Sequence, residues 1–310
     1  MSEPLILVTC RQMQVELPRH RGRIEKLGYD VVAPDLGGRQ QFTAAELLEF
    51  RSQLVGIIAG DDELSREFFE GATQLRTVIR WGIGMDSVDH EAARQHGITV
   101  RNTPGVFGQE VADSAFAYIL NLARGHIAVD VAVRNGEWPK VEGFTLAGSR
   151  LGIVGLGAIG REIAKRGQGF EMDVVAFDPF ADQAPPNVAL VDLDQLLKTS
   201  RFIVLACPLT PDTFHLINGN RLELVRPDAY LVNVARGPVV SEPDLIDALK
   251  SRRLAGAGLD VFEVEPLPLD SELRTLPNVV LGAHNASNTR EGVMRASTTA
   301  VDYLIEELTR

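Results

Sequence analysis

The chain has little cysteine and no long apolar run. Cys10 and Cys207 are its only cysteines among 310 residues, and two cysteines so far apart suggest reduced thiols in the core rather than a disulfide framework. The first apolar stretch follows the acid Glu3 and is too short for a signal core or a membrane span. These features predict a cytoplasmic protein that does not enter a membrane.

Positive charge is also scarce. The 31 Lys and Arg residues are outnumbered by 42 Asp and Glu, and the formal net charge of -11 argues against a nucleic-acid surface. The sequence has no closely spaced Cys/His cluster and no His-Glu-x-x-His pattern, so we expect no metal site. The 45% hydrophobic content is enough for the cores of two ordinary domains.

Short apolar runs alternate with helical patterns along the whole chain, which predicts an α/β protein with parallel sheets. The expected strands before residue 103 are 5–8, 31–33, 54–59, 77–80 and 98–100, and those after it are 151–154, 174–177, 188–191, 202–206, 230–234, 257–260 and 279–282. Early helices are expected at 19–27 and 44–52, a connecting helix at 107–123, and a last amphipathic helix at 288–308 that returns to the first domain.

A glycine-rich turn joins the strand at 151–154 to a helix, in the order Gly155-Leu-Gly157-Ala-Ile-Gly160. Gly155 suits the tight turn, Gly157 lets the backbone approach a pyrophosphate, and Gly160 lets the helix pack closely on the strand. The next strand ends in Asp178, 18 residues after Gly160, where a ribose-binding carboxylate is expected.

Asp178 favours NAD over NADP, because a carboxylate accepts from both ribose hydroxyls and repels a 2′-phosphate. Pro179 and Phe180 follow it and bring no arginine that would reverse this preference. The alternative is an ordinary glycine turn beside an exposed acid at the end of a strand.

Arg236, Glu265 and His284 each follow an apolar strand in the second half of the chain. Ligands of open α/β sheets bind beyond the carboxyl ends of the strands, so these side chains are expected to meet in one crevice. Arginine can hold a carboxylate with two hydrogen bonds. Histidine can donate a proton to a carbonyl oxygen during reduction and can remove that proton from the hydroxyl group in the reverse direction. Glu265 would orient the imidazole, and Asp260 would add to its electrostatic field. The group predicts reversible hydride transfer between a 2-hydroxy acid and nicotinamide.

Each of the three also has a structural alternative: Arg236 as a cap of strand carbonyls, Glu265 as a loop acid, and His284 as a buried core histidine. Their co-occurrence favours the catalytic interpretation. The other histidines lie in predicted helices or polar connections without a matching acid and base, and we expect them to be structural or solvated: His20, His90, His96, His126 and His215.

Over nearly its whole length the chain resembles the D-isomer-specific 2-hydroxyacid dehydrogenases, and among them the phosphoglycerate-dehydrogenase-like members. The ordered motifs are Gly82-Ile-Gly-Met-Asp86, Asn102-Thr-Pro-Gly105, Gly155-Leu-Gly-Ala-Ile-Gly160, Cys207-Pro-Leu-Thr210, Asn233-Val-Ala-Arg-Gly237, Asp260-Val-Phe-Glu-Val-Glu-Pro266 and His284. The resemblance implies that Arg236 orients the substrate, that Glu265 is its acidic helper, and that His284 is the acid/base.

The resemblance also implies two Rossmann-like domains. The substrate-binding domain would span 1–102 and 285–310, completed by the C-terminal helix, and the NAD-binding domain would span 103–284. Substrate contacts are expected at Ile83, Gly84 and Arg236. The expected NAD(H) contacts are Gly155, Gly157, Ala158, Ile159, Gly160, Asp178, Cys207, Pro208, Thr213, Val234, Ala235 and Asp260. Relatives form homodimers, and residues 135–144 look like their dimerising arm, in which Trp138 is either an anchor or a local core aromatic.

Two departures from the family pattern bear on the substrate. The segment after the third strand, residues 58–63, is acidic where a basic, hydroxyl-rich loop is typical, so a phosphate would need compensation from elsewhere, such as Arg80. The common Thr-Pro-His is here Gly282-Ala-His284, which predicts altered local hydrogen bonding. The serine-sensing domain of some relatives is not expected.

The leading hypothesis is an NAD-dependent dehydrogenase that reduces a small 2-keto acid such as hydroxypyruvate or glyoxylate. A second hypothesis is an NAD(H)-sensing binding protein, akin to the corepressors that share this fold. A third is an enzyme of the same fold that oxidises an inorganic or one-carbon substrate. Turnover distinguishes the first two.

Overall fold

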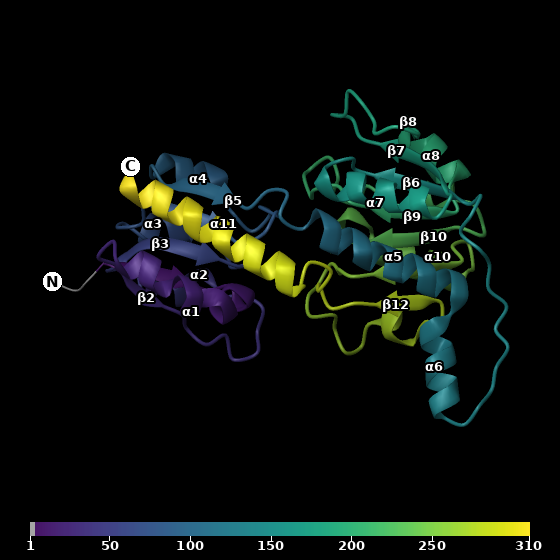
Figure 1. Cartoon of the computed structure of the whole chain (residues 1–310), viewed down its shortest axis with the longest axis horizontal. Helices are drawn as coiled ribbons and strands as arrows, with labels where there is room; N and C mark the ends of the chain where they lie inside the picture. The colour runs from purple at the N-terminus through teal and green to yellow at the C-terminus, as the bar shows by residue number, and fades with distance from the viewer. Residues whose placement is uncertain (1–3) are drawn as a thin grey trace. The chain divides into compact units, whose positions relative to one another are not determined.

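The computed structural model describes residues 4–310, and the chain divides into two α/β units (Figure 1). Unit 1 comprises Met1–Phe107 and Asn288–Arg310, and unit 2 comprises Gly108–Ser287. Glu3 lies outside the described residues.

The boundaries of the units lie a few residues beyond those expected from the sequence, 102 and 284. Residues 103–107 stay with unit 1 because Thr103 donates its backbone N–H to Gly82 O at 3.0 Å, and Arg295 donates to Val106 O at 2.6 and 2.9 Å. The assignment of substrate and cofactor binding to the two domains stays a prediction.

Unit 1 is built on a parallel sheet of five strands in the order β2-β1-β3-β4-β5. Three of the strands, β1 (Leu5–Val8), β3 (Leu54–Ala59) and β4 (Thr77–Arg80), have the bounds predicted from the sequence, and β2 (Asp30–Val32) and β5 (Thr99–Asn102) differ by one or two residues at their ends. All four residues of β1 and of β4 are buried, as expected of central strands covered on both faces.

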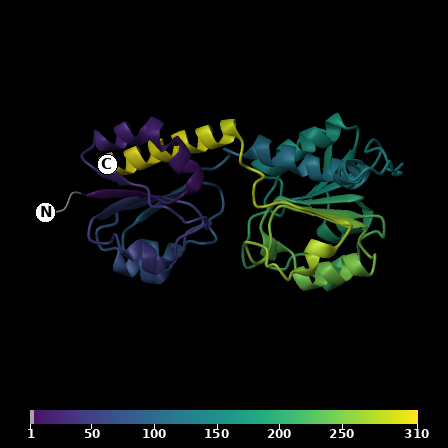
Figure 2. The same cartoon turned by 90° about the horizontal axis from the view of Figure 1, so that it is seen from below.

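Helices cover both faces of this sheet (Figure 2). On one face α1 (Arg11–Glu25) packs beside α11 (Arg290–Thr309), which also contacts β3 and β4. The other face is covered by α2 (Ala44–Leu48), α3 (Arg66–Gly71) and α4 (His90–Gln95), whose core includes Phe68 and Phe69. The last helix therefore completes the first domain, as predicted.

Two helix predictions in unit 1 need correction. The structure begins α1 at Arg11 instead of residue 19, because Met13 and Leu17 are buried one turn apart despite the polar residues between them. It ends α2 at Leu48 instead of residue 52, because the backbone turns after Glu49 to enter β3.

Unit 2 is built on a seven-stranded parallel sheet in the order β12-β11-β10-β9-β6-β7-β8. The strands are β6 (Arg150–Val154), β7 (Asp173–Phe177), β8 (Val188–Leu190), β9 (Phe202–Leu205), β10 (Tyr230–Asn233), β11 (Gly256–Leu259) and β12 (Val279–Leu281), each within one residue of its predicted end. One face is covered by α5 (Gly108–Arg124) and α7 (Ala158–Gly169), and the other by α8 (Leu193–Thr199), α9 (Gly219–Leu222) and α10 (Glu242–Lys250) (Figure 2). The order places β6, β9, β10 and β11 side by side at the centre, so their carboxyl ends form one continuous edge.

One element of unit 2 projects from the layers. None of the nine residues of α6 (His126–Arg134) is buried, and Figure 1 shows this helix extending away from the sheet. The following segment carries Trp138, which is 77% exposed. The alternative interpretation of Trp138, as a local core aromatic, is therefore wrong. No single helix within residues 4–310 is long and apolar enough to cross a membrane. Helices α5 and α6 meet the requirements of length and composition only when taken together, and they are bent by 65° relative to each other.

Candidate active site

The glycine turn after β6 has space for a ligand at one glycine and no space for a side chain at the other two. Gly155 has φ +95°, and a Cβ there would lie 2.7 Å from the backbone nitrogen of Cys207. A Cβ on Gly160 would lie 2.0 Å from Gly155 O. A Cβ on Gly157, in contrast, would meet no protein atom within 4 Å. The backbone at Gly157 is therefore open to an external group.

A pyrophosphate fits this turn. Gly157 is the N-cap of α7, a 12-residue helix whose first residues are Ala158 and Ile159. The N–H groups of a helix's first turn lack intrahelical acceptors and favour an anion. The open backbone and the helix N-terminus together supply what a dinucleotide phosphate requires.

The carboxylate of Asp178 lies beside this turn. β7 pairs with β6 through Val154 and Phe177, and Asp178 follows directly. Its Oδ2 accepts from the backbone N–H of Leu156 at 2.7 Å, and its Oδ1 accepts from Phe180 N–H at 2.9 Å. The acid predicted to bind ribose and the turn predicted to bind phosphate are thus in contact, although ribose binding itself stays a prediction.

The remaining predicted cofactor residues follow β9, β10 and β11, which continue the same edge of the sheet: Cys207, Pro208, Thr213, Val234, Ala235 and Asp260. Thr213 donates its hydroxyl to Pro208 O at 2.7 Å, which fixes the loop after β9. Burial, with a smaller contribution from the charge of Asp178, raises the pKa of the Cys207 thiol to about 11. Cys207 is half-buried rather than a full core residue, whereas Cys10 is buried as expected.

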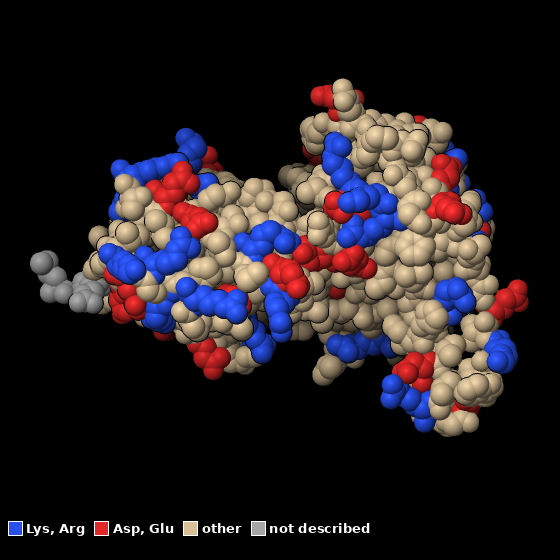
Figure 3. Space-filling view, viewed as in Figure 1, with Lys and Arg blue, Asp and Glu red and all other residues tan. Residues whose placement is uncertain are grey.

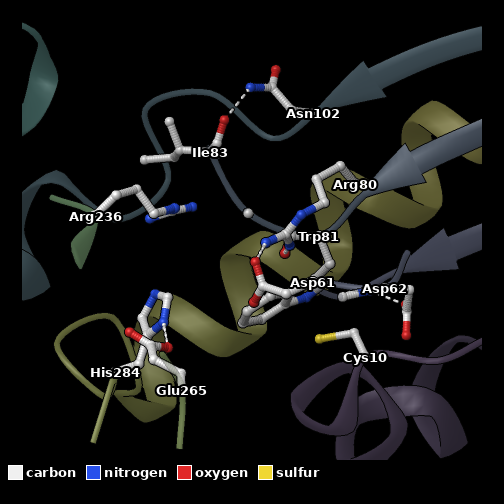
Figure 4. A network of polar contacts seen from close by, with 12 residues as sticks. Cys10, Asp61, Asp62, Arg80, Trp81, Ile83, Asn102, Arg236, Glu265 and His284 are labelled. Carbon is white, nitrogen blue, oxygen red and sulfur yellow. Dashed lines mark hydrogen bonds and ion pairs between the residues drawn. The ribbon is translucent and has the colours of Figure 1, made fainter. Parts of the chain in front are cut away.

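His284 and Glu265 form a close pair at the edge of unit 2, beyond β12 and β11. The imidazole Nδ1 lies 2.7 Å from Glu265 Oε2, and Figure 4 shows the two side chains facing each other. The other carboxylate oxygen, Oε1, accepts from the backbone N–H of Phe262 at 2.9 Å. The carboxylate is therefore fixed on one side and orients the imidazole on the other.

Asp260 holds the backbone on which His284 sits. It is 3% exposed, its backbone oxygen accepts from His284 N–H at 2.7 Å, and its carboxylate accepts from Asn285 N–H at 3.2 Å and from Ala286 N–H at 2.9 Å. His284 has φ +50°, a conformation that few residues other than glycine adopt without such support.

Tyr118, on α5, is a residue of this site that the sequence analysis missed. Its hydroxyl donates to Asp260 Oδ1 at 3.0 Å, and burial, with the nearby charge of Asp260, raises the pKa of the phenol above its usual range. A Cβ on Gly282 would lie 2.1 Å from the Tyr118 hydroxyl and 2.4 Å from Asp260 Oδ1. The tyrosine hydroxyl thus occupies the space that a side chain at position 282 would need, which explains the Gly282 departure from the common threonine.

Arg236 follows β10 and precedes a short 3-10 turn, Gly237–Val239. Asn233 donates its side-chain amide to Arg236 O at 3.0 Å, and a Cβ on Gly237 would lie 1.9 Å from the backbone of Phe262. The loop bearing Arg236 therefore packs tightly on the loop between Asp260 and Glu265. One guanidinium nitrogen of Arg236 donates to Ala235 O at 2.9 Å.

The predicted substrate residues of unit 1, Ile83 and Gly84, lie in the loop after β4. Asn102 donates its side-chain amide to Ile83 O at 2.8 Å, and Thr103 Oγ1 accepts from Gly82 N–H at 2.9 Å. Arg80, at the end of β4, is ion-paired with Asp61 and donates to Trp81 O. The arginine considered as a compensating phosphate ligand is thus already paired with a carboxylate.

One prediction about the other histidines was wrong. His215 Nε2 lies 2.9 Å from Glu263 Oε1, so His215 does have an acidic partner. The two residues are 48 positions apart, and the loops after β9 and β11 bring them together. Burial lowers the pKa of His20 on α1, in keeping with its predicted structural role.

Comparison with known proteins identifies the family. Residues 116–286 match the family model "D-isomer specific 2-hydroxyacid dehydrogenase, NAD binding domain". The chain is 43% identical over 243 residues to a glyoxylate reductase of Thermococcus litoralis, with 74% of this chain and 73% of that protein covered. It is 37% identical over 257 residues to a hydroxypyruvate reductase of Thermotoga maritima, with 81% and 84% covered.

A solved structure of a Thermus thermophilus protein superposes with a TM-score of 0.88 at 35% identity, covering 98% of this chain and 97% of that one. The fold and the site thus define an NAD(H)-dependent oxidoreductase of 2-hydroxy acids. The chain belongs to the D-isomer-specific 2-hydroxyacid dehydrogenase family.

Proposed function

We propose that this enzyme reduces a small 2-keto acid of the glyoxylate or hydroxypyruvate type with NADH, and that Arg236, Glu265 and His284 are its catalytic residues. The observation that carries the proposal is the 2.7 Å contact between His284 Nδ1 and Glu265 Oε2. It is supported by the similarity to glyoxylate and hydroxypyruvate reductases.

The protein residues have separate tasks in this reaction. The guanidinium of Arg236 binds the substrate carboxylate, because its planar fork matches two oxygens. His284 holds a proton on Nε2 and gives it to the carbonyl oxygen of the keto acid, which becomes the hydroxyl group. Glu265 keeps the ring in the required orientation through Nδ1 and stabilises the imidazolium. In the oxidation direction His284 accepts the same proton.

The cofactor would be held by the glycine turn at Gly155–Gly160 and by Asp178. Bound NADH supplies the hydride that reduces the carbonyl carbon. Asp178 selects NADH over NADPH because a carboxylate at this position repels a 2′-phosphate.

The test is NADH oxidation, followed by absorbance, with glyoxylate, hydroxypyruvate, pyruvate, 2-oxoglutarate and phosphohydroxypyruvate. We expect the highest kcat/KM with glyoxylate or hydroxypyruvate. Tight NADH binding without turnover on any of these acids would refute the proposal and favour an NAD(H)-sensing protein.

We also propose that the enzyme is a cytoplasmic homodimer joined through α6 and the segment that follows it. Ile127, Val131 and Val133 are 55%, 52% and 42% exposed on α6, and Trp138 and Val141 are 77% and 53% exposed beyond it. Large apolar side chains gathered on one projecting segment are typical of a protein interface. Light scattering should give a dimer mass for the native chain and a monomer mass for Val131→Glu.

A further inference from the structure

We propose that Asp61 determines the substrate class of this enzyme: it neutralises Arg80 beside the loop at Ile83–Gly84, so that the enzyme accepts 2-keto acids with a neutral group beyond the carbonyl and rejects those carrying a phosphate or a second carboxylate. The proposal rests on the proposed function, because it assumes that Ile83 and Gly84 contact a 2-keto acid.

The topology of unit 1 brings the two charged residues together. β3 and β4 are parallel neighbours, and Ala59 at the end of β3 is in register with Arg80 at the end of β4. Asp61 lies two residues beyond Ala59, and its carboxylate forms an ion pair with Arg80 (Figure 4). Both side chains therefore stand at the carboxyl edge of the sheet, where the predicted substrate loop also begins.

Arg80 lies directly beneath that loop. A Cβ on Gly82 would lie 2.9 Å from Arg80 Nη1, and Arg80 also donates to Trp81 O. The loop cannot move away easily, because Gly82 and Ile83 are tied to Thr103 and Asn102. Any anion that reached the Gly82–Gly84 loop would meet this guanidinium first if Asp61 did not pair with it.

The exposure of the two partners decides which charge a ligand meets. The side chain of Arg80 is 5% exposed, whereas that of Asp61 is 45% exposed. A ligand at this edge therefore contacts the carboxylate and not the guanidinium. A hydroxyl group can donate to that carboxylate, but a phosphate or a carboxylate is repelled by it.

Neighbouring acids fix Asp61 in this position. Asp62 is buried and accepts from the backbone N–H groups of Gly60 and Phe42, at 2.9 and 2.8 Å, and from the hydroxyl of Thr9. Glu63 accepts from Ala44 N–H at 3.0 Å. Of the three acids in the segment, Asp61 is the one whose carboxylate pairs with Arg80, and the backbone on its C-terminal side is anchored by the other two.

The experiment compares kcat/KM for phosphohydroxypyruvate, hydroxypyruvate and glyoxylate in the native enzyme, Asp61→Asn and Asp61→Ser. Glyoxylate has no group beyond its carbonyl, so each value is divided by the glyoxylate value of the same variant. We expect both substitutions to raise the phosphohydroxypyruvate ratio by about tenfold or more, the effect of about 1.4 kcal/mol of charge interaction. The hydroxypyruvate ratio should fall in Asp61→Asn.

A second readout does not depend on turnover. Inorganic phosphate should raise the melting temperature of Asp61→Asn more than that of the native protein, because the carboxylate that repels phosphate and neutralises Arg80 is lost. Asp302→Asn is the control, since it removes one acid from a different ion pair of unit 1, in which the partner Arg23 is exposed, and should change neither readout.

The outcomes separate this inference from the proposed function. If the native enzyme reduces glyoxylate or hydroxypyruvate but the phosphohydroxypyruvate ratio of both Asp61 variants equals that of the native enzyme, the inference is wrong and the proposed function stands. A native preference for phosphohydroxypyruvate would also overturn it. If the native enzyme reduces none of the acids, the proposed function itself fails.

Discussion

Glu265 Oε2 lies 2.7 Å from Nδ1 of His284, while the other oxygen of the same carboxylate accepts a hydrogen bond from the backbone of Phe262. The acid is thus anchored to the loop after β11 and positions a histidine that follows β12. Acidic and basic residues are mixed over the visible surface of both units (Figure 3), so close pairs of charged side chains are common in this protein. What distinguishes the pair of Glu265 and His284 from the others is its position beyond the carboxyl ends of β11 and β12.

Glu265→Gln should lower kcat by about 10–100-fold, because a hydrogen bond to a charged group contributes about 1.5–3 kcal/mol. The amide keeps the shape of the carboxylate but cannot stabilise an imidazolium. Steady-state kinetics with NADH and the best keto acid measure the effect. Glu263→Gln is the control, since Glu263 pairs with His215 and not with His284. Equal losses in the two variants would argue against a specific role for Glu265.

Tyr118→Phe should lower kcat by about tenfold or less, a smaller loss than in Glu265→Gln, because the tyrosine acts on the histidine only through Asp260. Asp260 would keep its bonds to Asn285 and Ala286 but lose the one to the phenol. Tyr230→Phe, a residue whose ring stacks on Phe202, is the control for loss of a tyrosine hydroxyl in unit 2.

Gly282→Ser tests the same contact from the other side. Alone it should inactivate or destabilise the enzyme, because its Cβ would lie 2.1 Å from the Tyr118 hydroxyl. Combined with Tyr118→Phe, it should recover part of the stability, because the overlap with the phenol oxygen is removed while the one with Asp260 Oδ1, at 2.4 Å, remains. Additive losses in the double variant would contradict the proposed relationship.

Gly157→Ala should weaken NADH binding, whereas Gly160→Ala should lower the stability of the fold. A Cβ at position 157 meets no protein atom, so the variant should melt near the native temperature but bind NADH less tightly. A Cβ at position 160 overlaps Gly155 O, so that variant should be destabilised even without cofactor. Gly169→Ala, at the far end of α7, also meets no atom and is the control. Thermal melts and NADH fluorescence titrations decide the outcome, and full NADH affinity in Gly157→Ala would contradict a phosphate site there.

Asp178→Asn should relax the preference for NADH over NADPH, because the charge that repels a 2′-phosphate is lost. Ratios of kcat/KM for the two cofactors measure this change. Asp173→Asn, an acid paired with Arg150 at the opposite end of β7, is the control. Equal use of NADH and NADPH by the native enzyme would refute the role of Asp178.

The thiol of Cys207 should react slowly with iodoacetamide at pH 8. With a pKa of about 11, roughly one thiol in a thousand is ionised at that pH. Its reactivity should rise with pH towards 11, and Asp178→Asn should increase it by removing a nearby negative charge. Mass spectrometry of the labelled peptides follows the reaction, and labelling of Cys207 at the rate of a free cysteine would contradict the raised pKa.

The strands were predictable from the sequence because they are short apolar runs bounded by polar turns. The position of α11 in unit 1 was predictable because its apolar stripe follows the last strand and needs a sheet to cover. Helix α1 was harder, since Met13 and Leu17 are separated by polar residues that conceal the buried face.

The site was partly predictable for the same reason. His284 and Glu265 each follow a recognisable strand, so their meeting at one edge could be inferred from a parallel sheet. Tyr118 could not, because its hydroxyl reaches Asp260 from a helix 142 residues earlier in the chain. The pairing of Asp61 with Arg80 likewise depends on the register of β3 and β4, which the sequence alone does not specify.

The most direct test of the central claim is a comparison of native enzyme and His284→Ala, measuring both kcat/KM for glyoxylate and the dissociation constant of NADH. We predict that kcat/KM falls by about 10²–10⁴-fold, the usual effect of losing a general acid, while NADH binding is retained. Unchanged turnover in His284→Ala would contradict the account.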